Sequence, residues 1–358
     1  MNRTTLRVSA PGRICLFGEH QDYLGLDVIA AAIDLRISIT GNRRRDRIFD
    51  IDLPDIGGGE RIDLGEELAY AHKRDYLRSA LNVLRRNGAA IPLGWDIVIR
   101  GTIPINAGTS SSSALVVAWN KFLLAAESDP RAEMPGEIAE LGFLTEVAEF
   151  KEPGGKMDHY ASSFGGIIRL EFDAPLRVTR LANPLKEFVL GDSLQKKDTT
   201  RTLGSVKERV LNGVGSLRGT IPGFRLVSPW TPEIERAVGT LEPSVQRPLR
   251  GAFANRDLTR KGVDLFTGPF DETAFGRLLN RQQEILREDL GISTPKIDRM
   301  LDAALGAGAL GGKINGSGGG GCMFAYAPGR AEETAAAVEN AGGKAYIIRV
   351  DEGARFET

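Results

Sequence analysis

The hydrophobic pattern of the chain alternates between short apolar stretches, typical of strands, and longer stretches with apolar residues every three or four positions, typical of helices. Leu115, Ala118, Trp119 and Phe122 follow the helical spacing. Strands are predicted at residues 6–10, 13–17, 35–40, 48–53, 95–99, 167–172, 322–326 and 344–350. Helices are predicted at residues 75–86, 136–150, 203–212, 274–289 and 296–306, besides the helix containing Trp119 and one between the last two strands.

The order of these elements predicts an α+β fold, because the helices do not alternate with strands in the βαβ rhythm of a doubly wound sheet. A chain of 358 residues, 42% hydrophobic and 26% charged, is long enough for two ordinary cores. The composition loosens around residues 173–186, which we interpret as the connection between the two halves. The predicted domains are therefore residues 1–185 and 186–358.

Charge and cysteine content indicate which kind of binding partner and which cellular compartment to expect. Lysine and arginine number 46 against 47 aspartates and glutamates, so no net charge draws the protein to nucleic acid or to an anionic membrane. We find no apolar stretch of membrane-spanning length and no secretory leader, and two isolated cysteines do not make a disulfide framework. We therefore expect a cytoplasmic protein that binds small molecules, as a monomer or a weak homodimer.

The most informative stretch is residues 11–25, PGRICLFGEHQDYLG. Within ten residues it places Arg13, Glu19, His20 and Asp22 where a buried strand enters a turn. Charged groups are seldom placed beside a core strand without partners, and this set suits a hydroxyl-rich small molecule. The alternative is an interior arginine–glutamate pair beside a satisfied core histidine.

A second stretch, residues 104–119, reads PINAGTSSSSALVVAW. A predicted strand runs into a turn, then into four serines that begin the helix containing Trp119. Serines at a helix start can cap free amides, and an anion bound there meets the favourable end of the helix dipole. The pattern predicts a phosphate cradle, with a serine-rich linker as the alternative.

A third stretch, residues 311–327, is the glycine-rich GGKINGSGGGGCMFAYA. Such glycines permit positive φ angles and close approach of the backbone to a ligand. Gly316, Gly318 and Gly321 also fit the dinucleotide pattern GxGxxG, but the residues that follow read as a strand, not as the helix that pattern requires. A nicotinamide-dependent dehydrogenase is therefore a weak alternative.

Together the three stretches resemble the GHMP kinases, whose motifs are PG(K/R) with GEH, P-x3-G-(L)-S-S-S-A, and a late glycine-rich loop. All three occur here in that order. The resemblance covers essentially the whole chain. It implies an N-terminal domain like ribosomal protein S5 domain 2, a ferredoxin-like C-terminal domain, and an active site between them that uses ATP and Mg2+.

The resemblance also implies a role for each matched residue. Asp158 and Arg13 would be the catalytic pair, with Asp158 accepting the proton of the acceptor hydroxyl or acting through its charge. Sugar hydroxyls would be bound by Glu19, His20, Asp22 and Tyr23. ATP would be bound by Gly108, Thr109, Ser110, Ser111, Ser112, Ser113, Gly318 and Gly319. Mg2+ would be bound by Ser112 and Glu146.

Within the family, the chain is more similar to galactokinases than to mevalonate kinases. Galactokinases carry PGR and GEHTDYNGG, close to PGR and GEHQDYLGL here, whereas mevalonate kinases carry PGK and GEHAVVYG. Glu146 also stands twelve residues before Asp158, as the matching glutamate and aspartate do in galactokinases. Gln21 and His159 depart from the galactokinase pattern, and residues 191–199 look like a mevalonate kinase segment.

These observations predict phosphorylation of a monosaccharide at its anomeric hydroxyl, giving a sugar 1-phosphate and ADP. Two alternatives stay open: a mevalonate kinase-like enzyme, and a GHMP-fold sugar sensor that has lost catalysis. For individual residues, His20 could be a core histidine that orients Glu19, and Asp158 could be a helix cap.

Overall fold

Two sheets organise the chain, and the computed structural model describes residues 4–105, 108–172, 175–196 and 199–358 of it. The eight-stranded first sheet has the order β12-β1-β2-β5-β3-β4, with β6 paired to β2 and β7 paired to β6. Its strands are β1 (Thr5–Phe17), β2 (Val28–Arg43), β3 (Ile48–Leu53), β4 (Gly58–Asp63), β5 (Trp95–Gly101), β6 (Ile167–Glu171), β7 (Arg177–Leu181) and β12 (Arg355–Phe356). All its pairs are antiparallel except β3 with β5.

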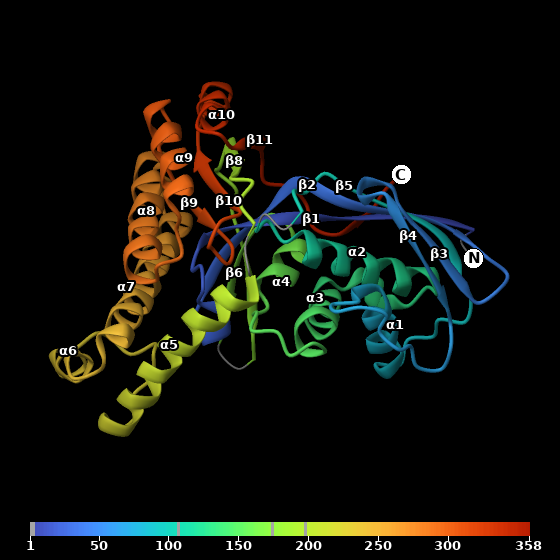
Figure 1. Cartoon of the computed structure of the whole chain (residues 1–358), viewed down its shortest axis with the longest axis horizontal. Helices are drawn as coiled ribbons and strands as arrows, with labels where there is room; N and C mark the ends of the chain where they lie inside the picture. The colour runs from blue at the N-terminus through green and yellow to red at the C-terminus, as the bar shows by residue number, and fades with distance from the viewer. Residues whose placement is uncertain (1–3, 106–107, 173–174, 197–198) are drawn as a thin grey trace.

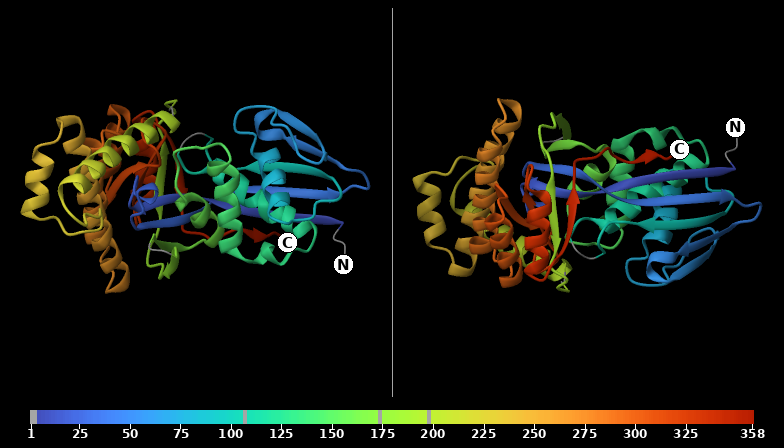
Figure 2. Two further views of the ribbon diagram at one scale, coloured as in Figure 1. Left: turned by 90° about the horizontal axis from the view of Figure 1, so that it is seen from below. Right: turned by 90° about the horizontal axis from the view of Figure 1, so that it is seen from above.

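The long hairpin of β1 and β2 runs along much of the molecule (Figure 2). The prediction of separate strands at 6–10 and 13–17 is wrong, because β1 continues through Pro11 and Gly12 with a shift in pairing register. Such a bulge accommodates a proline that cannot donate to the ladder. A Cβ on Gly12 would lie 2.8 Å from the carbonyl oxygen of Thr109, so glycine here lets the serine loop approach β1.

Four α-helices belong to the first half: α1 (Tyr76–Arg86), α2 (Ser111–Ala126), α3 (Pro135–Phe143) and α4 (Met157–Phe164). A π-helical segment, Leu144–Ala148, extends α3. Short 3-10 turns occur at Asp22–Leu24, Pro54–Ile56 and Pro130–Glu133. Figure 1 shows α1 to α4 gathered on one side of the β1, β2 and β5 strands. This helical layer packs on apolar side chains of the sheet such as Val8, Ile39 and Ile97, whereas Ile14 and Phe17 of β1 belong to a core cluster shared with the second half.

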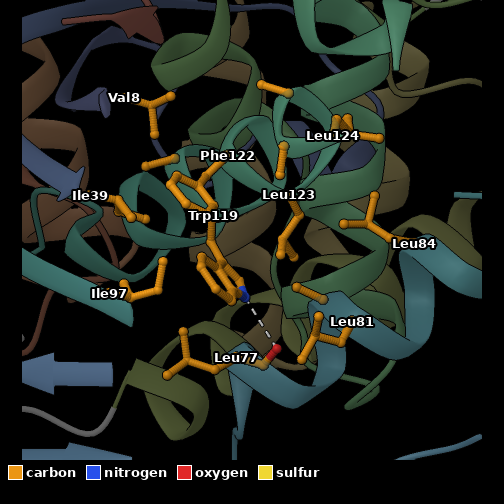
Figure 3. Packing of buried hydrophobic residues seen from close by; sticks show 14 of the residues in the cluster. Val8, Ile39, Leu77, Leu81, Leu84, Ile97, Trp119, Phe122, Leu123 and Leu124 are labelled. Atoms are coloured by element: carbon orange, nitrogen blue, oxygen red, sulfur yellow. Dashed lines mark hydrogen bonds between the residues drawn. The ribbon is translucent and has the colours of Figure 1, made fainter. Parts of the chain in front are cut away.

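Helix α2 lies at the centre of this layer, as its apolar sequence predicts. Trp119 is fully buried, stacks on Phe122 at 5.7 Å between ring centres and meets Phe49 edge to face at 5.5 Å. Its indole N–H donates to the carbonyl oxygen of Leu77 in α1 at 3.2 Å (Figure 3). This packing fixes the helix whose first residues are the serine loop.

The second sheet has four antiparallel strands in the order β11-β8-β10-β9. They are β8 (Phe188–Asp192), β9 (Gly311–Asn315), β10 (Cys322–Tyr326) and β11 (Lys344–Ile348). The helices of this half are α5 (Thr199–Thr220), α6 (Pro232–Gly239), α7 (Pro243–Thr267), α8 (Glu272–Glu284), α9 (Pro295–Gly306) and α10 (Ala331–Asn340), with a π-helical segment at Ile285–Asp289. Figure 1 places α6, α7 and α8 at the end of the molecule opposite both chain termini. No helix of the described residues is both long enough and apolar enough to cross a membrane.

A shared core joins the two halves. Phe17, at the end of β1, meets Phe275 of α8 edge to face at 5.7 Å, and Phe275 also contacts Phe188 of β8. The chain then returns to its start, because β12 pairs with β1 and Arg36 of β2 donates to the side chain of Asp351 and the carbonyl oxygen of Gly353. The two halves are therefore packed and hydrogen bonded to each other at several points.

The interpretation of residues 173–186 as a loose connection is wrong for Arg177–Leu181, which forms β7; residues 173 and 174 lie outside the described residues. Its RVTRL sequence alternates polar and apolar residues, as expected for a half-buried edge strand. Strands β4, β8, β9 and β12 and helices α4, α6 and α7 were not predicted either. Strand β9 begins with two glycines, which carry no side chain to give a strand pattern.

Candidate functional site

The three sequence stretches meet at one cavity of about 170 Å³ between the two halves. It lies where the end of β1, the serine loop, the start of α4 and the glycine-rich loop converge. The lining includes all of the following predicted residues: Arg13, Glu19, His20, Asp22, Tyr23, Gly108, Ser110, Ser111, Ser112, Ser113, Glu146 and Asp158. Of the predicted residues, Thr109, Gly318 and Gly319 do not line it.

The centre of the cavity is an ion pair between Arg13 and Asp158. Arg13 of β1 donates from Nε to Asp158 Oδ1 at 2.7 Å, and Ser110 Oγ donates to Oδ2 at 2.6 Å. Burial alone would raise the pKa of Asp158, but the Arg13 charge and the Ser110 hydrogen bond outweigh burial and lower it below its ordinary value. Asp158, in the first turn of α4, is therefore an ionised and weakly basic carboxylate at neutral pH.

The serine loop is held against this pair by its backbone. Arg13 Nη1 donates to the carbonyl oxygen of Gly108 at 2.6 Å, and the Arg13 backbone N–H donates to Thr109 at 3.2 Å. Ser110 adopts φ +59° and precedes α2, but its hydroxyl bonds Asp158 and does not cap the helix, contrary to the simplest expectation for a serine there. The start of α2, with Ser111 and Ser112, consequently faces the cavity and favours a bound anion.

Glu146 lies on the π-helical segment after α3, a distortion frequent at functional sites. Its Oε2 accepts a hydrogen bond from His159 Nε2 at 2.8 Å, and His159 is buried directly after Asp158. The Nδ1 atom of His159 has no hydrogen-bond partner among the described residues, which favours the neutral tautomer with its proton on Nε2. Glu146 and the Ser112 hydroxyl line the same cavity, and both are hard oxygen donors of the kind that Mg2+ binds.

Asp22, Tyr23 and His20 form a further part of the cavity wall. Asp22 accepts hydrogen bonds from the backbone N–H of Tyr23 at 2.9 Å and of Met157 at 3.2 Å. The Tyr23 hydroxyl donates to His20 Nδ1 at 2.7 Å, and His20 Nε2 donates to the carbonyl oxygen of Ser317 at 3.0 Å. A Cβ on Gly155 would lie 1.9 Å from Asp22, so this wall closes tightly on the loop before α4.

Asp22 gives a prediction about pH. Burial, reinforced by the negative charge of Asp158, raises the pKa of Asp22 from 3.8 to about 6. A raised pKa means that the folded protein binds this proton more tightly, so stability falls as pH rises from about 4 to about 6. Asparagine has no such proton to lose. We therefore expect the unfolding free energy of Asp22→Asn minus that of the wild type to rise by about 2 kcal/mol from pH 4 to pH 7.5. Urea unfolding at both pH values measures this, and a difference that stays constant with pH would contradict it.

Glu19 is placed differently from the other residues of its motif. It is 1% exposed, and both carboxylate oxygens have protein partners: Lys313 Nζ donates to Oε2 at 2.5 Å and the Gly316 N–H donates to Oε1 at 2.9 Å. The predicted role of Glu19 in binding substrate hydroxyls therefore has an alternative: Glu19 is one half of a buried ion pair with Lys313.

The glycine-rich loop contributes its first residues to the cavity, Gly316 and Ser317, and not Gly318 and Gly319. The backbone N–H of Gly319 donates to the carbonyl oxygen of Ile292 at 2.8 Å, and a Cβ on Gly318 would lie 2.5 Å from Ile292. Those two glycines serve close packing of the loop on the second half.

The sequence analysis missed several residues at or near the cavity. Arg74 and Glu152 form a two-pronged ion pair in its wall, with both N···O distances 2.8 Å, and Tyr76 lies beside them. Lys313 and Asn315 stand behind the wall on β9, both fully buried. Nothing in the pattern around Arg74 marked it, whereas a lysine after two glycines in the glycine-rich motif GGKING was a visible signal.

Three family models match parts of this chain. Residues 75–166 match the model of the GHMP kinase N-terminal domain, residues 266–345 match that of the GHMP kinase C-terminal region, and residues 2–43 match the galactokinase galactose-binding signature. The last match covers the motif that supplies Arg13 and Asp22.

Similarity to individual proteins extends along the whole chain. The mevalonate kinase of Thermococcus onnurineus is 31% identical over 98% of this chain and 97% of its own, and the galactokinase of Pasteurella multocida is 26% identical over 90% and 86%. The crystal structure of Lactococcus lactis galactokinase complexed with galactose superposes with a TM-score of 0.87, at 21% identity over 99% of this chain and 95% of that one. The mevalonate kinase of Methanococcus jannaschii has a TM-score of 0.73, at 19% identity over 98% and 100%. The chain belongs to the GHMP kinase family.

Proposed function

We propose that this GHMP kinase transfers the γ-phosphoryl group of ATP to the anomeric hydroxyl of a monosaccharide, with galactose as the first candidate. The observation that carries this proposal is one cavity that combines the Arg13–Asp158 pair with the wall of Asp22, Tyr23 and His20. Hydroxyl-rich ligands suit a carboxylate acceptor such as Asp22, which can accept two hydrogen bonds at once.

Phosphoryl transfer needs alignment and neutralisation of charge more than covalent chemistry from the protein. In the reaction, the anomeric oxygen loses its proton as it bonds to the γ-phosphorus, and the bond from that phosphorus to the β-phosphate oxygen breaks to give ADP. We propose that Asp158 accepts that proton late, or stabilises the developing charge through Arg13, because its lowered pKa makes it a weak base.

The proposed ATP site consists of the serine loop, the start of α2 and the first residues of the glycine-rich loop. Ser112 and Glu146 would hold Mg2+, which supplies charge neutralisation on the phosphates. His159 then fixes Glu146 through its Nε2–H, so the carboxylate keeps its orientation toward the cavity.

Mevalonate remains the second candidate, because mevalonate kinases stand among the most similar relatives, at up to 31% identity. The charges in the wall favour a neutral acceptor. Among the described residues that line the cavity, the arginines are Arg13 and Arg74, and each is paired with a carboxylate. Repulsion between Asp22 and a mevalonate carboxylate favours a sugar. Lys207 of α5 is the cation that a mevalonate carboxylate could use instead, since its Nζ lies 5.4 Å from the centre of the Tyr23 ring and donates to the carbonyl oxygen of Pro153 at 3.4 Å.

The proposal extends to the domains. We propose that residues 1–185 form the S5 domain 2-like part and residues 186–348 the ferredoxin-like part. The predicted boundary of 186–358 is too long at its end, because residues 355–356 return to the first sheet as β12. The order β11-β8-β10-β9, with helices between β8 and β9 and between β10 and β11, supports the second label, because it follows the βαββαβ connection of that fold.

The test is a competition assay. The full chain is incubated with ATP, Mg2+ and an equal mixture of galactose, its epimers, galacturonic acid and mevalonate, and the product is identified by mass and by the coupling of phosphorus to the anomeric carbon. We expect galactose 1-phosphate and ADP. Phosphomevalonate would support the second candidate, and nucleotide binding without turnover would support a sensor. Asp158→Asn protein purified in parallel controls for contaminating kinases.

A further inference from the structure

Lys313 is a fully buried charged residue that the proposed function leaves unexplained. It lies on β9, is fully buried and does not line the cavity. Its Nζ donates to Glu19 Oε2 at 2.5 Å and to the carbonyl oxygen of Ile314 at 3.0 Å, and lies 5.1 Å from the centre of the Phe324 ring. Burying a lysine and a glutamate together rarely gains stability over an apolar pair of similar size, so a specific geometric role is the better explanation.

The geometry that Lys313 fixes is a contact between two functional segments. Glu19 accepts the Gly316 N–H at 2.9 Å, and His20 donates to the Ser317 carbonyl oxygen at 3.0 Å. We call these two hydrogen bonds, between residues 19–20 and residues 316–317, the clasp. The clasp joins the wall that contains Asp22 to the glycine-rich loop.

Asn315 holds the third segment. It lies two residues after Lys313 and so on the same face of β9. Its Oδ1 accepts the backbone N–H of Cys15 at 2.9 Å, and its Nδ2 donates to the carbonyl oxygen of Gly108, which Arg13 also bonds. One face of β9, which belongs to the third motif, therefore contacts the other two motifs from behind the cavity.

These segments leave little room for displacement. His20 adopts φ +61°, a strained conformation for a residue with a side chain, and its ring is held by Tyr23 and Ser317. A Cβ on Gly316 would lie 2.6 Å from the carbonyl oxygen of Gly108. Loss of the charge that fixes Glu19 would consequently shift both walls of the cavity.

We propose that Lys313 is a positioning residue of this site. Through Glu19 it fixes the position of the sugar-binding wall relative to the glycine-rich loop. The acceptor and the nucleotide are thereby held in a fixed relative orientation. This rests on the proposed function for the identity of the acceptor. It reassigns Glu19 from substrate binding to positioning.

The experiment compares Lys313→Met, Glu19→Gln and the double variant with wild type, using the full chain. The control is Lys186→Met, which removes an exposed lysine 3.1 Å from Glu272 on the surface of the second half. Three quantities are measured: the melting temperature, the Kd of the β,γ-imido analogue of ATP with Mg2+ by calorimetry, and KM and kcat for galactose per folded molecule.

We expect Lys313→Met to lower the melting temperature by several degrees and to raise KM and Kd about tenfold, because it leaves the Glu19 charge buried and unpaired. The double variant should recover most of the melting temperature, since no charge is left unpaired, yet keep KM and Kd at least fivefold above wild type. Lys186→Met should match wild type in all three quantities.

A purely structural pair would behave differently: the double variant would regain wild-type KM and Kd together with stability, and that result would overturn the proposal. If Lys313→Met does not fold, Glu19→Gln and the double variant decide by the same criteria. If wild type binds the ATP analogue but does not phosphorylate galactose, the proposed function fails alone, and the Kd values still test the positioning role. Failure of wild type to bind the analogue would overturn both.

Discussion

Asp158→Asn is expected to lower kcat by about 10²-fold or more, because general acid–base or electrostatic catalysis by one positioned group contributes on that scale. The change keeps the shape of the side chain and removes the negative charge that Arg13 and Ser110 bond. The proton acceptor, or the charge beside the reacting hydroxyl, is lost. The measurement is kcat at saturating ATP and sugar, together with the Kd of the imido analogue of ATP, which should change little.

The matched control for this variant is Asp27→Asn. Asp27 also pairs with an arginine, Arg169, at 2.5 Å, but it does not line the cavity. Both variants remove a carboxylate from an arginine, although Arg169 keeps Glu171 at 3.3 Å. Both are therefore expected to lose some stability, and kcat is compared per folded molecule. A kcat for Asp158→Asn within a few-fold of the Asp27→Asn value would remove Asp158 from the mechanism.

Trp119→Ala is expected to lower the unfolding free energy by about 3–5 kcal/mol, because truncating a large buried aromatic leaves a cavity that its neighbours fill only in part. Trp119 is fully buried and meets the Phe49 ring edge to face. Figure 3 shows it packed beside Phe122 and Leu77. A loss of that size is a large fraction of the stability of a typical domain. Urea unfolding followed by circular dichroism measures it.

Trp119→Phe is the control, since it retains most of the apolar volume and loses the hydrogen bond to Leu77. We expect it to cost about 1–2 kcal/mol. Equal losses for the two variants would show that packing around α2 is less important than the single hydrogen bond. The alanine variant should also weaken nucleotide binding, because α2 carries the serine loop at its first turn.

Local sequence was sufficient to predict those helices and strands whose hydrophobic pattern and end signals lie within the element itself. Helix α1 begins at Tyr76 after an Asp75 cap and ends at Arg86, as predicted, and β3 and β10 match their predicted ranges. Helix α7 was missed because proline, glycine and charged residues dilute its pattern; Pro248 lies inside the helix. Packing on α5 and α8, and not intrinsic propensity, accounts for that helix.

For the site, the sequence by itself determined the family and the chemical groups: Arg13, Asp22, Glu146, the serines and Asp158 all reach the cavity from motifs that local pattern reveals. Only the tertiary structure decided which of these groups are free to act. Lys313 lies 294 residues from Glu19 and neutralises it, whereas the glycine-rich loop offers Gly316 and Ser317 in place of Gly318 and Gly319. The physical reason is that burial and charge pairing depend on contacts between residues distant in sequence, which no local period records.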